Sequence, residues 1–248
     1  MEIGIIGVGH IGKTLALKLA EAGHKVVVAN SSGPENIDKA TLATGAKAVT
    51  AKEAVENKEV IILSIPLNRI PEIAPLLESV SEEVTVIDTS NYYPARDHKI
   101  DSIESGLVES EWVAKQLGRT ISKAWNAIGA PSFESKGKPS GALDRFAIPF
   151  SADRDNDRKI ITQLIEETGF DAYYTGSIAD SWRQQPGAPI YCTDLTAKEM
   201  KDLIYTAERE RLPARRDLAF EAVYERMNNS KSNQDPEFRV RINRALYI

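Results

Sequence analysis

The sequence predicts an α/β protein with a doubly wound, mostly parallel sheet of about eight strands and a small helical domain at its C-terminal end. Short apolar runs rich in β-branched residues recur over the first 175 residues and alternate with amphipathic helical segments, which is typical of parallel α/β sheets. The first run leads directly into a glycine-rich turn. The composition, with 42% hydrophobic and 27% charged residues in 248, is that of a globular protein that buries its own core.

The glycine-rich turn follows the first expected strand, residues 2–6, and has the spacing Gly-x-Gly-x-x-Gly. Gly7 permits a tight turn, Gly9 lets backbone N–H groups approach a pyrophosphate, and Gly12 lets the next helix pack closely on the sheet. The phosphates then lie at a helix N-terminus, which favours anions. A helix and a second apolar run, residues 25–29, follow, so we interpret the turn as a Rossmann dinucleotide-binding turn and not an ordinary strand-to-helix turn. The cofactor-binding residues expected here are Gly7, Val8, Gly9, His10, Ile11 and Gly12.

The end of the second strand bears on which nucleotide binds. Asn30, Ser31 and Ser32 stand where an NAD-binding protein usually has Asp or Glu to hold the ribose 2′-hydroxyl. A carboxylate would repel the 2′-phosphate of NADP, whereas these uncharged side chains can donate hydrogen bonds to it, so the sequence favours NADP over NAD. The same residues are also common turn residues, and a purely structural role stays open.

The later apolar runs continue the sheet, and we expect strands over residues 46–49, 60–64, 84–87, 120–125, 146–150 and 171–175. Ligands of doubly wound sheets bind beyond the carboxyl ends of the strands. The cofactor-binding candidates at these ends are Ser64, Ile65, Pro66, Thr89, Asn126 and Ala127.

Two of these strand ends leave alternatives open. The polar turn over residues 88–94 either faces the nicotinamide or only caps backbone groups. Asn126 either positions the nicotinamide amide or a second substrate, or closes a turn. Residues 131–143 are rich in Ser, Gly, Lys and Pro and predict a mobile loop, which either folds over a site or simply connects strands.

The composition changes after Ile178, where charged helical segments replace the strand pattern. We expect an NADP-binding Rossmann domain over residues 1–178 and a small helical C-terminal domain over residues 179–248. The second domain is too short to bury a core alone, so it is expected to pack on the sheet or on a second subunit. Residues 228–236 are polar and predict a loop.

Charge and cysteine content exclude several classes of function. The net charge of −5 argues against a nucleic-acid partner held by a basic surface. The single cysteine, Cys192, cannot form an internal disulfide and lacks the clustering of a metal site. No apolar run reaches membrane-spanning length and no signal peptide is evident, so we expect a cytoplasmic protein with no metal and no membrane partner.

Several short motifs occur in a fixed order along the chain: the glycine turn, Asn-Ser-Ser-Gly-Pro at 30–34, Ser-Ile-Pro at 64–66, Ile-Asp at 87–88, Asn-Tyr-Tyr-Pro at 91–94, Lys-Ala-Trp-Asn at 123–126 and Trp-Arg-Gln-Gln-Pro-Gly at 182–187. In this order the chain resembles the NADP oxidoreductases of the coenzyme F-420-dependent family. The resemblance implies a Rossmann domain, NADP(H) at the glycine turn, a second substrate over the nicotinamide near the C-terminal domain, and a homodimer. One departure is Ser32, because many relatives have an arginine there that would grip the 2′-phosphate.

The activity implied by the resemblance is hydride transfer between the nicotinamide and a flat acceptor, such as a deazaflavin (F-420) or a flavin. Direct hydride transfer requires no general acid or base, so no catalytic residue is assigned and Asn126 is a positioning candidate. A first alternative is a dehydrogenase or reductase of a small carbonyl or hydroxy acid, related to the 6-phosphogluconate dehydrogenase group. A second alternative is a non-catalytic NADP-sensing protein.

Overall fold

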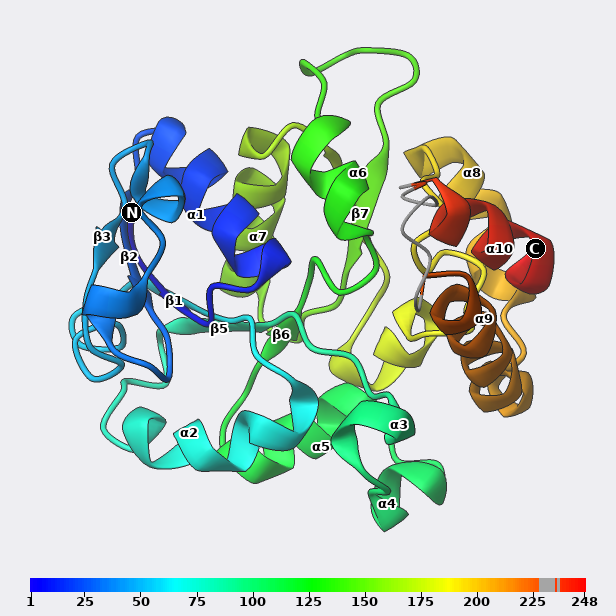
Figure 1. Ribbon diagram of the computed structural model, residues 1–248, viewed down its shortest axis with the longest axis horizontal. Helices are drawn as coiled ribbons and strands as arrows, with labels where there is room; N and C mark the ends of the chain where they lie inside the picture. The colour runs from blue at the N-terminus through cyan, green and yellow to red at the C-terminus, as the bar shows by residue number, and fades with distance from the viewer. Residues whose placement is uncertain (228–234, 236) are drawn as a thin grey trace.

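The centre of the computed structural model is a parallel sheet with the strand order β3-β2-β1-β4-β5-β6 (Figure 1). In chain order its strands are β1 (Glu2–Ile6), β2 (Lys25–Ala29), β3 (Lys47–Ala48), β4 (Val60–Leu63), β5 (Thr85–Asp88) and β6 (Ser122–Lys123). The strand order reverses at β1, which pairs with β2 on one side and with β4 on the other. This is a doubly wound sheet, as predicted, and its switch point lies between β1 and β4.

The structure describes residues 1–227, 235 and 237–248. Apart from Asp235, the loop expected over residues 228–236 lies outside the described residues.

The prediction of about eight strands in one sheet is wrong, because the sheet has six. The last two expected strands, β7 (Ala147–Phe150) and β8 (Asp171–Tyr174), pair with each other in parallel as a separate two-stranded sheet. A single antiparallel bridge joins the two sheets, with Lys123 and Ser151 exchanging backbone hydrogen bonds of 2.9 Å. β6 is only two residues long, and Pro149 has no N–H to donate, so β7 cannot continue a long ladder on β6.

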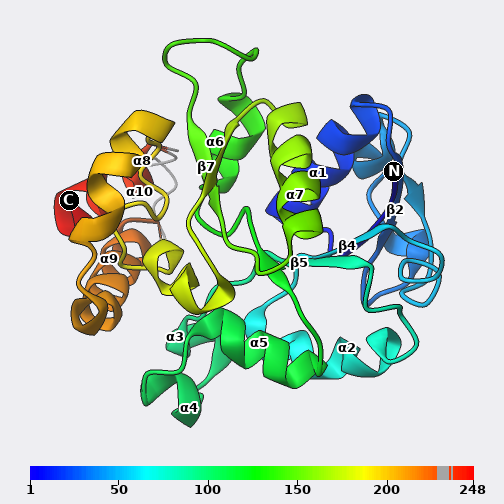
Figure 2. The same ribbon diagram turned by 180° about the vertical axis from the view of Figure 1, so that it is seen from behind.

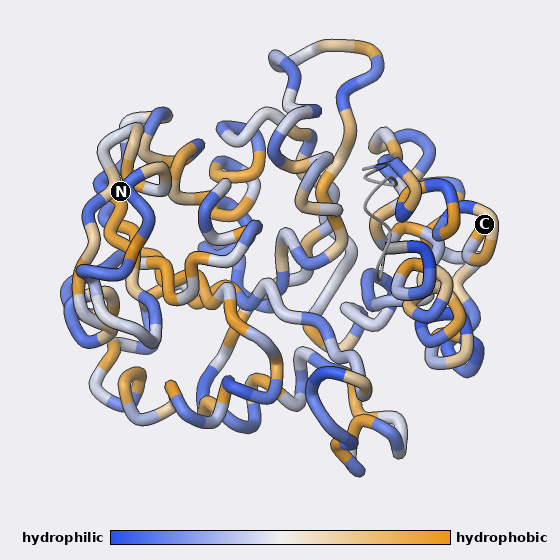
Figure 3. Tube along the Cα trace, viewed as in Figure 1, coloured by the Kyte–Doolittle hydropathy of each residue, from blue (hydrophilic) through white to orange (hydrophobic). Residues whose placement is uncertain are grey.

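Both faces of the six-stranded sheet are buried, which explains why its strands are apolar runs without polar alternation. On β4, Val60 and Ile62 belong to one core and Ile61 and Leu63 to the other, and all four side chains are fully buried. Figure 3 shows the continuous hydrophobic trace along the central strands.

Helices cover each of these faces (Figures 1 and 2). One core is closed by α1 (His10–Glu21), α6 (Ala130–Ser135) and α7 (Asp155–Glu167). The opposite core is closed by α2 (Ile70–Leu77) and α5 (Glu109–Leu117). The connections of the first half contain the short helices α3 (Pro94–Asp97) and α4 (Asp101–Glu104) and the 3₁₀ turns η1 (Pro34–Asn36), η2 (Lys39–Leu42) and η3 (Leu67–Arg69).

The segment expected as a loop over residues 131–143 begins as a helix. Pro131 lies in the first turn of α6, where a proline is tolerated, and Phe133 is fully buried against the core. After α6 the chain projects from the molecule before it enters β7 (Figure 1). The Lys138 N–H donates to the carbonyl of Gly169 at 2.8 Å, so this projection is tied to the turn after α7.

Helices follow Ile178, and the described residues of this part contain no strand. They are η4 (Ile178–Gln184), α8 (Ala197–Leu203), η5 (Ile204–Thr206), η6 (Arg209–Arg211), α9 (Leu212–Met227) and α10 (Phe238–Tyr247). They gather at the side of the molecule opposite β3 (Figures 1 and 2) and share small apolar clusters with Ala127 and Ala147. The helical character is as predicted, whereas the division at residue 178 stays a prediction. No helix among the described residues is long and apolar enough to cross a membrane.

Candidate functional site

A cavity of about 700 Å³ opens where β1, β2 and β4 end. Its wall brings together three of the predicted groups: part of the glycine turn, the end of β2 and the residues after β4. From these groups it is lined by Gly7, Val8, Gly9, Asn30, Ser31, Ser32, Ser64, Ile65 and Pro66. Arg69 of η3, Glu72 and Ile73 of α2 and Arg96 of α3 also line it. We call it the glycine-turn cavity.

The three glycines of the turn differ in their surroundings. Gly7 has a φ of +99°, and a Cβ there would lie 2.2 Å from the carbonyl oxygen of Ser64. A Cβ at Gly12 would lie 2.0 Å from the carbonyl oxygen of Gly7. Gly9 has a φ of −65°, and a Cβ there would meet no atom of the described residues within 4 Å. The fold itself therefore requires Gly7 and Gly12, whereas Gly9 keeps free a space that borders the cavity.

The space beside Gly9 lies at the N-terminus of α1. The Lys13 N–H donates to the carbonyl of Gly9 at 2.8 Å, and the earlier N–H groups of the first turn have no partner within the helix. Within the described ranges, no side chain caps this helix end and its first turn carries no acidic residue. The end can therefore accept an anion, and the residues present fit a pyrophosphate.

His10 and Ile11 begin α1 without lining the cavity. His10 is exposed, and its carbonyl accepts a 3.0 Å hydrogen bond from the hydroxyl of Thr14. Ile11 is half-buried against the core on the α1 side of the sheet. Their backbone N–H groups belong to the first turn of α1 and have no partner within the helix, so they can face a ligand at the helix end.

Asn30 shapes the turn after β2. Its Oδ1 accepts a hydrogen bond from the Ser32 N–H at 3.2 Å, and Asn36 donates to the Ser32 carbonyl and to the Glu35 carboxylate. These contacts show the turn-forming role that the sequence left open. Ser31 and Ser32 are exposed at the cavity wall, so their hydroxyls are accessible from it.

Ser64, Ile65 and Pro66 carry the end of β4 along the glycine turn. The Ser64 N–H donates to the carbonyl of Ile6 at 2.8 Å, which places this segment directly beside Gly7. All three residues are half-buried or exposed and line the cavity, as expected for residues beyond a strand end.

Thr89, Asn126 and Ala127 are not among the residues that line the glycine-turn cavity. The Thr89 hydroxyl donates to the Leu63 carbonyl at 3.2 Å. The Asn126 amide donates to Asn91 at 3.0 Å and to the Gln184 carbonyl at 2.8 Å, and its Oδ1 accepts from Gln184 at 2.9 Å. Ala127 packs in an apolar cluster with Tyr191. Asn126 therefore ties the end of β6 to η4, and contact of these three residues with a cofactor stays a prediction.

A buried ion pair lies behind the turn over residues 88–94, and sequence reasoning missed it. The Lys123 ammonium donates to Asp88 Oδ2 at 2.6 Å and to the Ser90 carbonyl, and both charged side chains are fully buried. Asp88 also accepts a 3.0 Å hydrogen bond from the Ser90 N–H. Asp88 and Lys123 are partners in the pairing of β5 with β6. Only this register, which the sequence does not display, brings the two residues together.

Glu109, the first residue of α5, is buried next to the same turn. Its carboxylate accepts a 3.0 Å hydrogen bond from the Tyr92 N–H, and burial raises the pKa of the carboxyl to about 7. Asp88, Glu109 and Lys123 thus hold the 88–94 turn from behind. These contacts give the turn a structural role and fix the positions of Tyr92 and Tyr93.

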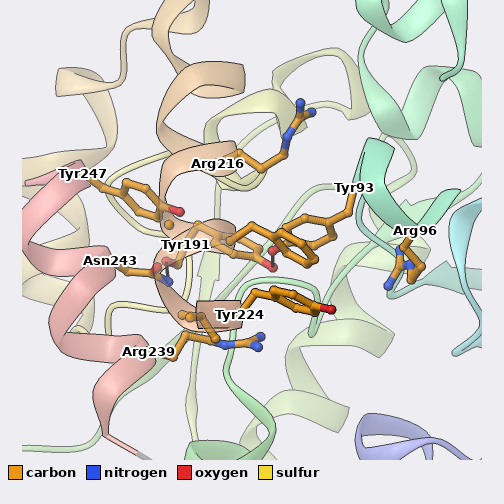
Figure 4. A pocket seen from close by; sticks show the side chains of 11 residues that line it. Tyr93, Arg96, Tyr191, Arg216, Tyr224, Arg239, Asn243 and Tyr247 are labelled. Atoms are coloured by element: carbon orange, nitrogen blue, oxygen red, sulfur yellow. Dashed lines mark hydrogen bonds between the residues drawn. The ribbon is translucent and has the colours of Figure 1, made fainter. Parts of the chain in front are cut away.

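A second cavity, of about 410 Å³, lies between α3, α9 and α10 (Figure 4). Its wall is aromatic and basic, with the lining residues Tyr93, Arg96, Tyr191, Arg216, Ala219, Phe220, Val223, Tyr224, Arg239, Asn243 and Tyr247. We call it the tyrosine cavity. Arg96 lines both cavities, so the two adjoin each other at this residue.

The hydroxyls of Tyr93 and Tyr191 form a 2.8 Å hydrogen bond at the wall of the tyrosine cavity (Figure 4). Burial raises the pKa of Tyr93 to about 12 and the pKa of Tyr191 well above its usual value, so both phenols stay protonated near neutral pH. The Phe220 ring lies 5.5 Å from that of Tyr93 and stacks on Tyr224 at 6.1 Å. Sequence reasoning missed this cavity because its wall combines residues 93 and 96 with residues between 191 and 247, which come at least 95 residues later in the chain.

From the sequence, a second substrate was expected near Asn126 and the C-terminal domain. Neither Asn126 nor Trp182, which belongs to that expected domain, lines the tyrosine cavity. The Trp182 ring instead contacts two guanidinium groups, those of Arg183 at 4.4 Å and Arg209 at 5.7 Å. Trp182 thereby fastens η4 to η6.

A doubly wound parallel sheet whose first strand enters a glycine turn at a helix N-terminus defines a Rossmann-type fold. The family model described as NADP oxidoreductase, coenzyme F420-dependent, matches residues 2–92. The resemblance predicted from the sequence motifs is therefore confirmed over this part of the chain, which contains the glycine-turn cavity except for Arg96.

The chain is also similar to individual proteins in sequence or in structure. Protein YjhV of Escherichia coli K12 is 39% identical over 80 residues, a match that spans 31% of this chain and 58% of that protein. The hypothetical protein SMa0349 of Sinorhizobium meliloti has a similar structure, with a TM-score of 0.69 at 27% identity, covering 79% of this chain and 96% of that one. A proposed F420-dependent NADP reductase of Arthrobacter sp. FB24 shares the fold, with a TM-score of 0.55 at 16% identity over 72% of this chain and 86% of that one.

Proposed function

We propose that the protein is an NADP(H)-dependent oxidoreductase that transfers a hydride between the nicotinamide and a flat acceptor such as a deazaflavin (F-420) or a flavin. The observation that carries this proposal is the free space beside Gly9 at the uncapped N-terminus of α1. No neighbour in the described part of the chain requires glycine at this position, and a pyrophosphate does. The match of residues 2–92 to an NADP oxidoreductase family supports redox chemistry over other uses of a bound nucleotide.

The chain's own residues would bind and orient the cofactor. Backbone N–H groups over residues 7–12 would hold the pyrophosphate, and Asn30, Ser31 and Ser32 would contact the adenosine ribose and its 2′-phosphate. Ser64, Ile65 and Pro66 would support the dinucleotide beside β4. When bound, the cofactor supplies the hydride, and the protein supplies alignment and exclusion of water.

The preference for NADP over NAD rests on the uncharged end of β2. Asn30 replaces the acidic residue that holds a free ribose 2′-hydroxyl, and the Arg69 guanidinium lines the same cavity. Two features oppose the preference: Arg69 pairs with Glu72 at 2.9 Å, and Glu35 lies in the turn itself. Titration with NADPH and with NADH measures the balance, and we expect NADPH to bind more tightly. An affinity ratio of one or below contradicts the NADP assignment.

A small carbonyl or hydroxy acid is the second candidate for the other substrate, and the tyrosine cavity favours it. This cavity adjoins the glycine-turn cavity at Arg96 and has a volume of about 410 Å³, in the lower part of the range for small-molecule sites. It also carries protonated phenols that can donate to an oxygen of the ligand.

Turnover with different acceptors tests the proposed function. The protein is mixed with NADPH and, in separate assays, with F-420, FMN, FAD or a panel of small carbonyl compounds, and the nicotinamide absorbance is followed. Oxidation of NADPH by F-420 or a flavin supports the flat acceptor, and oxidation by a carbonyl compound alone supports the second candidate. NADPH binding without oxidation by any acceptor contradicts the oxidoreductase proposal and favours an NADP sensor.

A further inference from the structure

We propose that the tyrosine cavity binds a compact, ring-bearing carboxylate whose anionic group is held by Arg239. Hydride exchange with the nicotinamide rests on the second candidate of the proposed function, and for that step the ligand carries a carbonyl or hydroxyl group beside its carboxylate. The proposal depends on three features of the cavity: a guanidinium without a carboxylate partner, an aromatic wall, and contact with the glycine-turn cavity.

Arg239 differs from the other two arginines of the cavity in its partners. Arg96 pairs with Asp97 at 2.7 Å, and Arg216 pairs with Asp217 at 2.7 Å. Arg239 forms no ion pair with any carboxylate of the described ranges, and residues 228–234 and 236 include no Asp or Glu. Its side chain reaches from α10 to the wall of the cavity (Figure 4). A guanidinium in this position can bind a carboxylate with two parallel hydrogen bonds.

The aromatic wall favours a ring. Phe220 and Tyr224 stack with an interplanar angle of 14°, and Tyr93 continues the wall at 5.5 Å from Phe220. Planar groups pack on such faces by offset stacking or edge-to-face contact. Tyr224 is 58% exposed in spite of its place in the wall, so a ligand ring would cover surface that is now open to water.

The phenol pair adds a hydrogen-bond donor. In the 2.8 Å contact of Tyr93 with Tyr191, one hydroxyl proton is used between the two oxygens and the other can point to a ligand oxygen. Asn243 is less available to donate to a ligand, because its side-chain Nδ2 already donates to the carbonyls of Tyr191 and Cys192 at 3.3 Å each. Arg239 therefore supplies the charge and the phenol pair supplies a neutral donor.

Binding to the cofactor-free, full-length protein tests the proposal. Benzoate and phenylpyruvate are titrated by calorimetry, and benzamide, which has a similar shape but no charge, is the control ligand. We expect both carboxylates to bind at least tenfold more tightly than benzamide. Equal affinity for benzoate and benzamide overturns the assignment of an anion site.

Matched variants test whether Arg239 is the residue that binds the carboxylate group of the ligand. Arg239→Gln is expected to remove the preference for benzoate, and Arg239→Lys to restore part of it. Arg241→Gln is the control. This substitution removes the same charge from the same helix, but Arg241 does not line the cavity. Unchanged benzoate binding by a folded Arg239→Gln variant, or an equal loss in Arg241→Gln, overturns the role of Arg239.

NADPH binding separates this proposal from the proposed function. If NADPH binds and Arg239→Gln weakens only benzoate, both proposals are supported. If NADPH does not bind but benzoate still binds through Arg239, the oxidoreductase proposal fails and the carboxylate site stands. Absence of benzoate binding by the folded protein overturns the carboxylate site, whether or not NADPH binds.

Discussion

Gly9 and Gly12 lie on the same turn, yet a side chain at each would have opposite effects. A Cβ at Gly12 would lie 2.0 Å from the carbonyl oxygen of Gly7, where neither backbone can move freely. A Cβ at Gly9 would occupy open space, and the φ of −65° there suits any residue. A substitution at Gly12 should therefore affect the stability of the fold, whereas a substitution at Gly9 should affect ligand binding.

We expect Gly9→Ala to keep the melting temperature within a few degrees of the native value and to weaken NADPH binding at least tenfold, because the methyl group would occupy the pyrophosphate space. Gly12→Ala is expected to destabilise the fold itself. Thermal unfolding and NADPH titration of both variants provide the measurement. Native NADPH affinity in Gly9→Ala would contradict the placement of the pyrophosphate.

The pair of Asp88 with Lys123 predicts a large effect of single substitutions. Lys123→Met leaves a fully buried carboxylate without its cation, and we expect a loss of about 3–5 kcal/mol in the free energy of unfolding. The double variant Asp88→Asn with Lys123→Met is expected to recover part of it. Urea unfolding provides the values, with Lys159→Met on the exposed face of α7 as a control that changes stability little. A loss below about 1 kcal/mol in Lys123→Met would contradict this account.

Glu109 makes the free energy of unfolding depend on pH, and the sign of this dependence follows from its raised pKa. Because burial raises the carboxyl pKa to about 7 in the folded protein, the folded state keeps a proton that the unfolded state has already released above about pH 4.5. This group therefore lowers stability as the pH rises from 4.5 to 7. We expect Glu109→Gln to remove this loss, up to about 3 kcal/mol, in urea unfolding across that range. A stability difference between variant and native protein that does not change with pH would contradict the raised pKa.

Some residues of the candidate sites could be predicted from the local sequence, and others could be found only in the folded structure. Gly7, Gly9 and Ser64 follow from local signals, because each lies next to a strand end that the apolar pattern displays. Lys123, Glu109 and Arg239 depend on strand register or on helices that meet only in the folded chain. A charged residue of these types is usually exposed, so its burial or its place in a cavity wall cannot be predicted from its neighbours in sequence.

At the level of elements, the strands and the doubly wound character of the sheet could be predicted, whereas the division of the strands between two sheets could not. All eight expected runs contain a strand, because short β-branched runs between turn residues are a local signal. Which strands share a sheet is decided by edges, and here β6 is too short and Pro149 cannot donate to a ladder. The helix at Ala130–Ser135 was missed because its proline and serines resemble a loop.

The separate two-stranded sheet predicts unequal protection from hydrogen exchange. β1 and β4 each pair with strands on both sides, whereas β3 lies at an edge and β8 pairs only with β7. We expect peptides covering β1 and β4 to exchange slowest and those covering β3 and β8 to exchange sooner, as measured by mass spectrometry. Protection of β8 equal to that of β4 would indicate one cooperative unit.

For the whole molecule, the C-terminal helices leave apolar side chains uncovered. Tyr205 and Leu218, which do not line the tyrosine cavity, are each more than half exposed. We propose that a homodimer covers part of this surface, as the family resemblance implies, and expect light scattering to give the mass of two chains. Leu218→Glu is expected to shift the mass toward one chain while the melting temperature changes little. A single-chain mass for the native protein would contradict the dimer.

The position of Arg96 between the two cavities can couple the binding of a ligand in one cavity to binding in the other. One guanidinium, fixed by Asp97 and the Asn91 carbonyl, forms wall for both cavities. A ligand that displaces it from one side changes the free energy of binding on the other. Such coupling is reciprocal by thermodynamic necessity, so each ligand would alter the affinity of its neighbour by the same factor. The apparent affinity for each ligand would then depend on the concentration of the other.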